Sequence, residues 1–513
     1  MTNLHLSNAR IWTADERQPD ASSMTIRQGR ITALDAPPTD EQVIDCKGAV
    51  VTPGLIDAHM HLLLGGASLE TLDLSVARSR EEFEALLADA HATLPPDAWL
   101  VGHGWSQDNW TDHTMPDLEW LAGAGDRPVV CWRTDWHAAL VNAPVLAACR
   151  LPDDDALELE GGRQLRLDDG RPSGLLLEAA AWNHLQPKIP KPSLARSREH
   201  LLAAQQHAHA LGLTAVRSME YARDILDVFE PMRNSLTLRC SLVLLDRELP
   251  LDLDWVERFA CDDVLSITGC KTFIDGTIGS RSARLLDDWA DRPGDRGMLV
   301  ELALAGRLDA WIDSVHASGL DAAAHAIGDE AVRIAIDLHE RAGGGRLTIE
   351  HGEVLHPDDL DRVAGAWFSM QPLHRADDAR NAVNALGSER AAWLAPLKSL
   401  QQAGARIAFG SDWPIVSCDP MRGIHAAVTA TTIDGDPFHP EQAIDAESAL
   451  AAYTRDAAEC CRLEGCGVLR PGALGDCVLW TGDPTHRGGL CEPPAPHLTI
   501  SAGNVVYDAR TST

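Results

Sequence analysis

Two histidines separated by one residue, His59 and His61, follow a short apolar segment, Leu55–Ala58, that begins after the turn at Pro53-Gly54. Side chains on a β-strand alternate between its two faces, so residues i and i+2 point the same way. Both imidazoles can therefore reach one ion from a single strand end, and imidazole is a common ligand for zinc and neighbouring divalent metals. Such a pair alone is more often two ordinary polar residues, so the metal interpretation depends on further ligands downstream.

Four more candidate ligands lie in or directly after apolar runs: Lys271 within Leu265–Ile274, His325 after Leu320–Ala324, His351 after Leu347–Glu350, and Asp412 after Arg406–Gly410. Taken singly, His325 and His351 read as core histidines, and Asp412 reads as a cap of the next helix. Their shared position at successive strand ends favours ligation. Beside a metal pair, Asp412 can also take the proton of a bridging water, because metal binding brings the pKa of that water near neutrality.

Lys271 is one of only five lysines in the chain and lies in a mostly apolar segment. Burial favours the neutral amine of a lysine. A neutral amine can react with carbon dioxide to give a carbamate, whose two oxygens are able to bridge two metals. The alternative is a buried stem with an ammonium that reaches water or pairs with Asp275. The four histidines and the aspartate at the strand ends favour the carbamate.

Short apolar runs alternate with helical stretches over most of the chain, which indicates an α/β fold with a parallel sheet. The eight candidate strands are Leu55–Ala58, Leu213–Arg217, Leu238–Leu244, Leu265–Ile274, Leu320–Ala324, Leu347–Glu350, Ala366–Met370 and Arg406–Gly410. Eight is the number that a closed (β/α)8 TIM-type barrel needs, and enzymes on this barrel carry their chemistry at the carboxyl ends of the strands.

The two chain ends, residues 1–52 and 461–513, are rich in alternating strand patterns and turn signals, and we expect them to pair into one small β-sandwich. Residues 53–460 then form the barrel. The gap of about residues 65–198 after the first strand is too long for one crossover helix and predicts an inserted subdomain over the barrel mouth. It carries Gly102–Trp105 and Arg133–His137.

The chain has 513 residues, 45% of them hydrophobic, and a formal net charge of −32, which disfavours nucleic acid and anionic membranes as partners. The first residues lack the pattern of a signal peptide, and no run of eighteen apolar residues occurs, so we expect a cytoplasmic protein. The 12 cysteines follow no framework, and the cluster Cys460, Cys461 and Cys466 lacks paired CxxC spacing, so these residues are expected to be small buried hydrophobes.

Eight segments together resemble the metal-dependent amidohydrolase superfamily, and within it the amidohydrolase 3 branch of YtcJ-like and N-substituted formamide deformylase-like proteins. They are PGLIDAHMH at Pro53–His61, HGW at His103–Trp105, HAALVN at His137–Asn142, KTFIDGTIGSRSA at Lys271–Ala283, HAIGDEAV at His325–Val332, IEHGE at Ile349–Glu353, MQPLH at Met370–His374 and GSDWP at Gly410–Pro414. With the β-rich ends, the resemblance covers nearly the whole chain.

The resemblance implies two divalent ions per chain, expected to be zinc. His59, His61 and Asp412 would hold the first, and carboxylated Lys271 would bridge to a second held by His325 and His351. Asp57, Glu350 and Asp275 are expected to orient ligand imidazoles, or are simply polar residues at strand ends. The residues expected to line the substrate pocket are His103, Trp105, His137, Gln371 and His374.

The reaction implied is hydrolysis of a non-peptide C–N bond at a carbonyl, in which a hydroxide held between the ions attacks and Asp412 transfers the proton to the departing nitrogen. The branch implies N-formyl or N-acyl amines as small-molecule substrates, and a homodimer. Two alternatives remain open: a deaminase or cyclic-amide hydrolase with the same metal centre, and a catalytically silent barrel scaffold.

Overall fold

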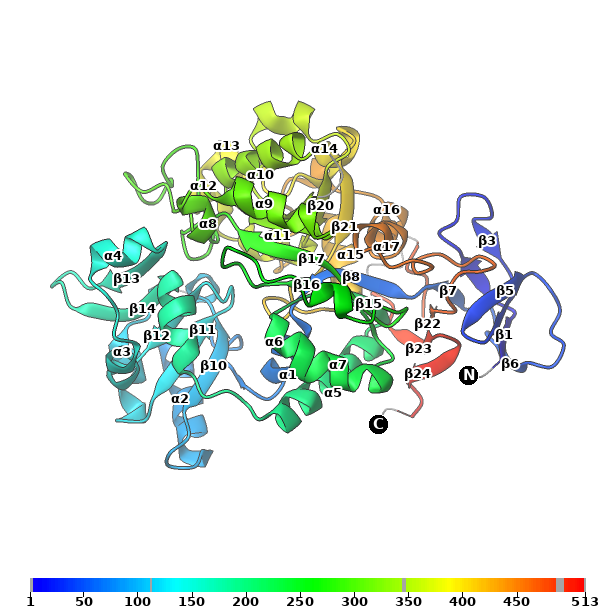
Figure 1. The fold of residues 1–513 in the computed structure, drawn as a ribbon, viewed down its shortest axis with the longest axis horizontal. Helices are drawn as coiled ribbons and strands as arrows, with labels where there is room; N and C mark the ends of the chain where they lie inside the picture. Colours follow the sequence, from blue (N-terminus) through cyan, green and yellow to red (C-terminus); the bar gives the residue numbers. More distant parts are fainter. Residues whose placement is uncertain (1–2, 111–112, 344–346, 486–492, 512–513) are drawn as a thin grey trace.

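The computed structural model describes residues 3–110, 113–343, 347–485 and 493–511. Its centre is an eight-stranded sheet in which every neighbouring pair of strands is parallel (Figure 1). In chain order the strands are β8 (Leu55–Met60), β15 (Leu213–Glu220), β16 (Arg239–Leu244), β17 (Leu265–Phe273), β18 (Asp321–Ala326), β19 (Leu347–His351), β20 (Trp367–Met370) and β21 (Arg406–Phe409). The spatial order follows the chain, as in a barrel.

The first and last strands meet just past their carboxyl ends. The backbone N–H of Asp412 donates to the carbonyl of His59 at 2.6 Å, and the N–H of Ser411 donates to Oδ1 of Asp57 at 3.0 Å. Gly410 lies against this junction, because a Cβ added there would stand 2.5 Å from the backbone nitrogen of His59. The predicted (β/α)8 barrel is confirmed, and its closure brings Asp412 beside the two histidines of β8.

Helices pack around the barrel strands, which are largely buried on both faces. The longer ones are α5 (Leu194–Ala210), α9 (Leu308–Ala317), α10 (Asp329–Arg341) and α15 (Pro420–Thr429), and the shorter ones include α1 (Leu62–Ser68), α11 (Pro372–Asp378), α12 (Ala382–Leu386), α13 (Ser388–Ala391), α14 (Leu397–Gln402), α16 (Ala446–Ala452) and α17 (Arg455–Cys460). Helix α5 begins at Ser193, whose hydroxyl accepts from the N–H of Arg196. Among the described residues, no helix is long and apolar enough to cross a membrane.

Strands from both chain ends form one six-stranded sheet in the order β24-β23-β22-β7-β2-β3. From the amino end come β2 (Arg10–Trp12), β3 (Asp20–Ala21) and β7 (Val50–Pro53), and from the carboxyl end β22 (Cys477–Trp480), β23 (Pro496–Ser501) and β24 (Asn504–Asp508). A four-stranded sheet of β1 (Leu4–Ser7), β4 (Met24–Arg27), β5 (Arg30–Leu34) and β6 (Gln42–Asp45) shares one apolar core with it. This is the predicted β-sandwich.

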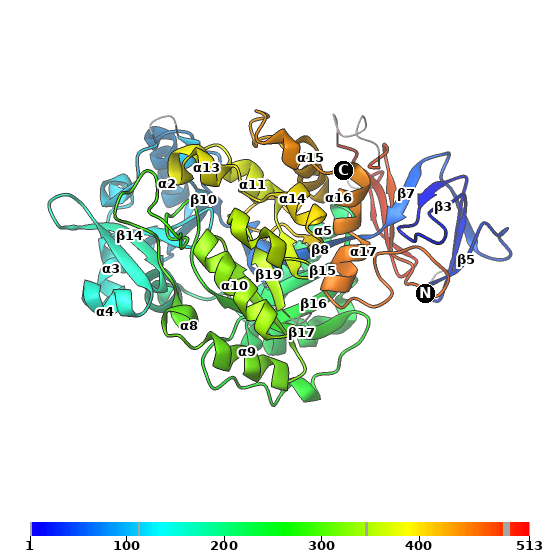
Figure 2. The same ribbon diagram turned by 90° about the horizontal axis from the view of Figure 1, so that it is seen from above.

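The segment between β8 and β15 contains a separate six-stranded sheet in the order β13-β14-β12-β11-β10-β9. Its strands are β9 (Leu72–Asp73), β10 (Leu100–Trp105), β11 (Val129–Arg133), β12 (Ala138–Val141), β13 (Gly162–Arg166) and β14 (Pro172–Glu178), with helices α2 (Arg80–Thr93), α3 (Ala143–Cys149) and α4 (Asp154–Leu159). Figure 2 shows this inserted subdomain and the β-sandwich at opposite ends of the molecule, with the barrel between them.

Candidate metal centre

The six predicted metal ligands all lie at the carboxyl edge of the barrel sheet. His59, Lys271, His325, His351 and Asp412 are buried, and the side chain of His61 is 16% exposed. His59 and His61 come from the end of β8, Lys271 from β17, His325 from β18, His351 from β19 and Asp412 from the turn after β21. The structure therefore brings residues that are up to 353 positions apart (412 minus 59) to one place.

His59 lies at the middle of this group. Its Nε2 is 2.8 Å from Nζ of Lys271 and 3.4 Å from Oδ1 of Asp412, and the same carboxylate oxygen is 3.3 Å from Nε2 of His61. The ring centroids of His59 and His351 are 4.9 Å apart. One ligand atom from each of His59, His351 and Asp412 lies within 4.8 Å of the others, which is the spacing of a shared ion.

Hydrogen bonds to one nitrogen of each buried imidazole leave the other nitrogen free to bind a metal. Nδ1 of His59 donates to Glu350 at 2.6 Å, and Nδ1 of His351 donates to Oε1 of Gln371 at 2.8 Å. Nε2 of His325 donates to the carbonyl of Gly276 at 3.1 Å. Nε2 of His351 and Oδ1 of Asp412 are buried without a hydrogen-bond partner among the described residues. Buried acceptors without partners are costly, so these atoms fit an ion-binding role.

The protonation states also suit ligation. Burial lowers the pKa of His59 to about 4 and lowers the pKa of His325 and of His351 well below the ordinary value. Burial likewise lowers the pKa of Lys271 to about 8. Burial opposes ionisation of Asp412, but the imidazoles of His59 and His61 hold its pKa well below the usual range. Near neutral pH the site presents unprotonated imidazoles and a carboxylate, the forms that bind metal.

Two of the candidate ligands have left-handed backbone conformations. His351 has φ 69° and Asp412 has φ 58°, a region that residues other than glycine seldom adopt. Such conformations cost of order 1–3 kcal/mol each and persist where the surroundings impose them, as at functional sites. His351 is the last residue of β19, and Asp412 lies in the turn after β21, so both conformations occur where the chain leaves a barrel strand.

A cavity that is partly open to solvent lies against this centre. The residues that line it include His137, His325, His351, Glu353, His374, Asp377, Asp378 and Asp412, with Arg133 and Asp135 from the inserted subdomain and Arg281 from the loop after β17. Of the five predicted pocket residues, His137 and His374 lie on its wall. His137 donates from Nδ1 to Glu178 at 2.8 Å and stacks on His325 with 5.1 Å between the ring centroids.

The other three predicted pocket residues have different positions. Gln371 is buried and holds the imidazole of the candidate ligand His351 through the contact described above. Trp105 is fully buried in the core of the inserted sheet, and its Nε1 donates to the carbonyl of Cys131 at 2.7 Å. His103 stacks on Trp136, with 6.0 Å between the centroids, and contacts the carbonyl of Ser68. Neither His103 nor Trp105 is among the described residues that line the cavity.

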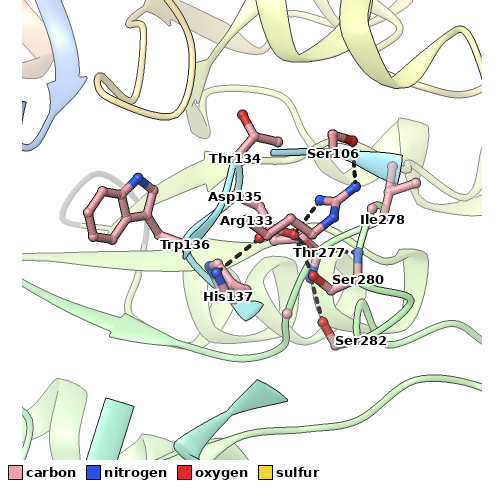
Figure 3. Close-up of polar contacts among 12 residues, drawn as sticks. Ser106, Arg133, Thr134, Asp135, Trp136, His137, Thr277, Ile278, Ser280 and Ser282 are labelled. Atoms are coloured by element: carbon pink, nitrogen blue, oxygen red, sulfur yellow. Dashed lines mark hydrogen bonds and ion pairs between the residues drawn. The ribbon is translucent and has the colours of Figure 1, made fainter. Parts of the chain in front are cut away.

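Asp135 joins the inserted subdomain to the barrel (Figure 3). Its Oδ2 accepts from Arg133 at 2.7 Å and from the hydroxyl of Thr277 at 2.6 Å, and also from the hydroxyl of Ser280. Its Oδ1 accepts from the N–H of His137 at 3.1 Å. Thr277 and Ser280 belong to the loop after β17, the strand of Lys271. The carboxylate therefore fixes the segment that carries His137 over the metal centre.

Several pocket residues were absent from the sequence prediction. Glu353 forms, with the predicted His374 and with His351, a second group whose ligand atoms lie within 4.8 Å of one another. Glu178 is buried beneath His137, and one of its carboxylate oxygens has no hydrogen-bond partner in the part of the chain that the structure describes. Glu353 lies two residues after His351 in the segment IEHGE, and this closeness in the sequence is the signal that could have identified it as a pocket residue. No local sequence pattern identifies Glu178, because its contact with His137 depends on the pairing of β14 with β12.

A parallel eight-stranded barrel with imidazole, carboxylate and lysine groups converging at its carboxyl edge defines the class of metal-dependent hydrolases. The chain belongs to the Amidohydrolase family: the model of that family, amidohydrolase 3, matches residues 42–507. This confirms the resemblance stated from the motifs.

Curated relatives match over most of their length. The chain is 31% identical to Protein LONG AFTER FAR-RED 3 of Arabidopsis thaliana, over 93% of this chain and 87% of that protein. It is 29% identical to Putative amidohydrolase YtcJ of Bacillus subtilis (strain 168), over 92% and 91%. It is 25% identical to N-substituted formamide deformylase of Arthrobacter pascens, over 88% of each chain.

A solved structure agrees with this assignment. An uncharacterized metal-dependent hydrolase from Pyrococcus horikoshii OT3 superposes with a TM-score of 0.77 and 26% identity, covering 96% of this chain and all of that one. The similarity extends over the barrel, the sandwich and the insertion together.

Proposed function

We propose that this protein hydrolyses a non-peptide C–N bond, in an N-formyl or N-acyl amine, at the carboxyl edge of the barrel. The observation that carries the proposal is the convergence of His59, His351 and Asp412, with Lys271 in contact with His59. His351 and Asp412 also line the cavity, and among the described residues Nε2 of His351 and Oδ1 of Asp412 have no hydrogen-bond partner. The name of the Arthrobacter relative, N-substituted formamide deformylase, supports this choice of bond.

The donor set suits two divalent ions, and we propose zinc. His59, His61 and Asp412 would hold one ion, His325 and His351 the other, and Lys271, as a carbamate, would bridge them. Bound there, the ions supply Lewis acidity, which polarises a carbonyl and lowers the pKa of water. The pKa of Lys271, about 8, keeps part of its amine neutral at physiological pH, as carbamate formation requires.

The chain's own groups orient the centre and move the proton. Glu350 and Gln371 hold the rings of His59 and His351 in place. Asp412 accepts the proton of the attacking water and returns it to the nitrogen of the breaking C–N bond, so that the products are a carboxylic acid and an amine. His137, oriented by Glu178 and held by Asp135, lies on the cavity wall, where it can hydrogen-bond the substrate.

Replacement of Asp412 by Asn tests this proposal. The variant removes the proton acceptor and keeps an oxygen that can bind metal, so bound metal should stay near the wild-type level and turnover should fall by at least about 100-fold. Metal analysis would accompany a screen of N-formyl amines, N-acyl amines, cyclic amides and aminated heterocycles. Unchanged turnover in Asp412→Asn refutes the assignment, and release of ammonia from a heterocycle would point to deamination instead.

A further inference from the structure

Several acidic side chains line the cavity, and Glu353 among them lies beside the candidate ligand His351. Among the acidic residues of the cavity, Asp108 and Asp135 pair with Arg133, at 2.8 and 2.7 Å, and Asp377 pairs with Arg380 at 3.2 Å. The cavity-lining Arg281 is itself engaged by Asp291 at 2.9 Å.

Among the residues that the structure describes, neither Glu353 nor Asp378 forms an ion pair with a Lys or Arg side chain, although Glu353 pairs with the imidazole of His374 and the charge of Arg133 acts on Asp378. Glu353 is 3% exposed; its Oε1 contacts Nδ1 of His374 at 3.3 Å, and its Oε2 is buried with no hydrogen-bond partner among the described residues. Asp378 is half-buried, and its carboxylate makes no hydrogen bond or ion pair with any residue that the structure describes. Burial, together with the charges of Glu353 and Asp377, raises the pKa of Asp378 well above its usual value.

A buried carboxylate oxygen without a donor is costly, and two neighbouring carboxylates repel each other. A cation that lies between them removes both penalties. His374 lies between Glu353 and Asp412: its Nδ1 faces Glu353, and its Nε2 is 4.0 Å from Oδ2 of Asp412. Its ring is parallel to that of His351, with 5.9 Å between the centroids. A group bound at Glu353 would thus lie about one imidazole away from Asp412, the proposed proton acceptor.

We propose that Glu353 and Asp378 form a subsite for a positively charged group of the substrate, an ammonium or guanidinium. This inference rests on the proposed function, and it narrows the substrate class to N-acylated amines that carry a second, cationic nitrogen a few bonds from the amide. It also distinguishes this chain's substrates from purely apolar formamides, which would leave Oε2 of Glu353 and the carboxylate of Asp378 without a hydrogen-bond donor among the described residues.

The binding of small amines and a diol tests the subsite without requiring any turnover. Calorimetry on the metal-loaded protein would compare 1,4-diaminobutane, 4-amino-1-butanol and 1,4-butanediol, which carry two, one and no positive charges. We expect affinity to rise with charge, and Glu353→Gln and Asp378→Asn each to weaken diamine binding about 10- to 100-fold, as for a lost charge-assisted hydrogen bond. Asp252→Asn, which removes an exposed carboxylate outside the cavity, is the matched control and should bind like wild type.

Diamine binding no tighter than that of the diol, or equal losses in the Asp252→Asn control, would overturn the subsite. Metal content provides a second criterion, because His351, Glu353 and His374 also have ligand spacing. Wild type and Glu353→Gln should hold the same metal per chain. Loss of one equivalent in the variant would assign Glu353 to an ion and overturn the proposal.

Turnover separates this inference from the proposed function. The ratio of kcat/KM for N-acetyl-1,4-diaminobutane to that for N-butylacetamide should fall at least about tenfold in Glu353→Gln and Asp378→Asn. Hydrolysis of both compounds with an unaltered ratio would contradict the subsite alone. Hydrolysis of neither, with charge-dependent diamine binding intact, would count against the proposed reaction and leave the subsite supported.

Discussion

Glu350 contacts both a candidate metal ligand and a buried arginine of the barrel. Its replacement by Gln should therefore change two measurable quantities, the free energy of unfolding and the metal affinity. Its Oε2 accepts from Nδ1 of His59 and its Oε1 from Nη1 of Arg217, both at 2.6 Å. The side chains of Glu350 and His59 are fully buried, and that of Arg217 is 2% exposed. The carboxylate thus compensates a buried guanidinium and fixes the imidazole of a candidate ligand.

Removal of one partner from a buried ion pair leaves the other charge uncompensated and costs about 3–5 kcal/mol. We expect Glu350→Gln to lower the free energy of unfolding by this amount, measured by urea denaturation at pH 7. A carboxylate that orients a ligand imidazole also raises the ligand's basicity, and its loss weakens metal binding about 10- to 100-fold. Competition with a chromogenic chelator would measure that second effect.

Asp476→Asn is the matched control. Asp476 forms another buried pair, with Arg239, at 2.6 and 3.0 Å, and touches none of the predicted ligands. It should destabilise the protein comparably and leave metal affinity at the wild-type value. The reasoning is refuted if Glu350→Gln keeps wild-type metal affinity, or if Asp476→Asn weakens metal binding equally.

The ion pair of Glu350 with Arg217 predicts that the stability of the fold depends on pH. Burial opposes the ionisation of Glu350, but the charges of Arg217 and His59 lower its pKa from 4.5 to about 2. A depressed folded-state pKa means that its stabilisation is complete above about pH 4.5 and is lost as the pH falls toward 2. The stability difference between wild type and Glu350→Gln should therefore shrink over that window in acid titrations of the unfolding midpoint.

Two further variants test the rest of the site. Lys271→Ala should lose both turnover and about one bound metal per chain, measured by elemental analysis, because the proposed bridge is removed. Full retention of metal would show that Lys271 is not a ligand. Asp135→Asn should lower the free energy of unfolding by about 1–3 kcal/mol and raise KM, because it loosens the segment that carries His137. Its metal content should stay constant, and an unchanged KM would contradict the positioning role of Asp135.

Local sequence patterns predicted the strands of the barrel, but they did not predict where its helices begin and end. The apolar spacing of residues 391–403 predicts one helix, but α13 ends at Ala391 and α14 begins only at Leu397, after Pro396, which has no N–H to donate within a helix. The spacing of residues 446–460 also predicts one helix, which the structure divides into α16 and α17 at Thr454, whose φ of −131° and ψ of −98° are not helical. Neither break altered the positions of the strand ends.

What the sequence by itself determined is the set of strand-end residues, because apolar runs mark buried strands and the residue after each run lies at the barrel mouth. Tertiary structure alone decided which side chains share the cavity. His103 and Trp105 lie on one strand, where Gly104, with φ 93°, interrupts the register, and neither is among the described residues that line the cavity. Glu353 and Asp378 both line it, since side-chain proximity between distant segments depends on packing that no local pattern encodes.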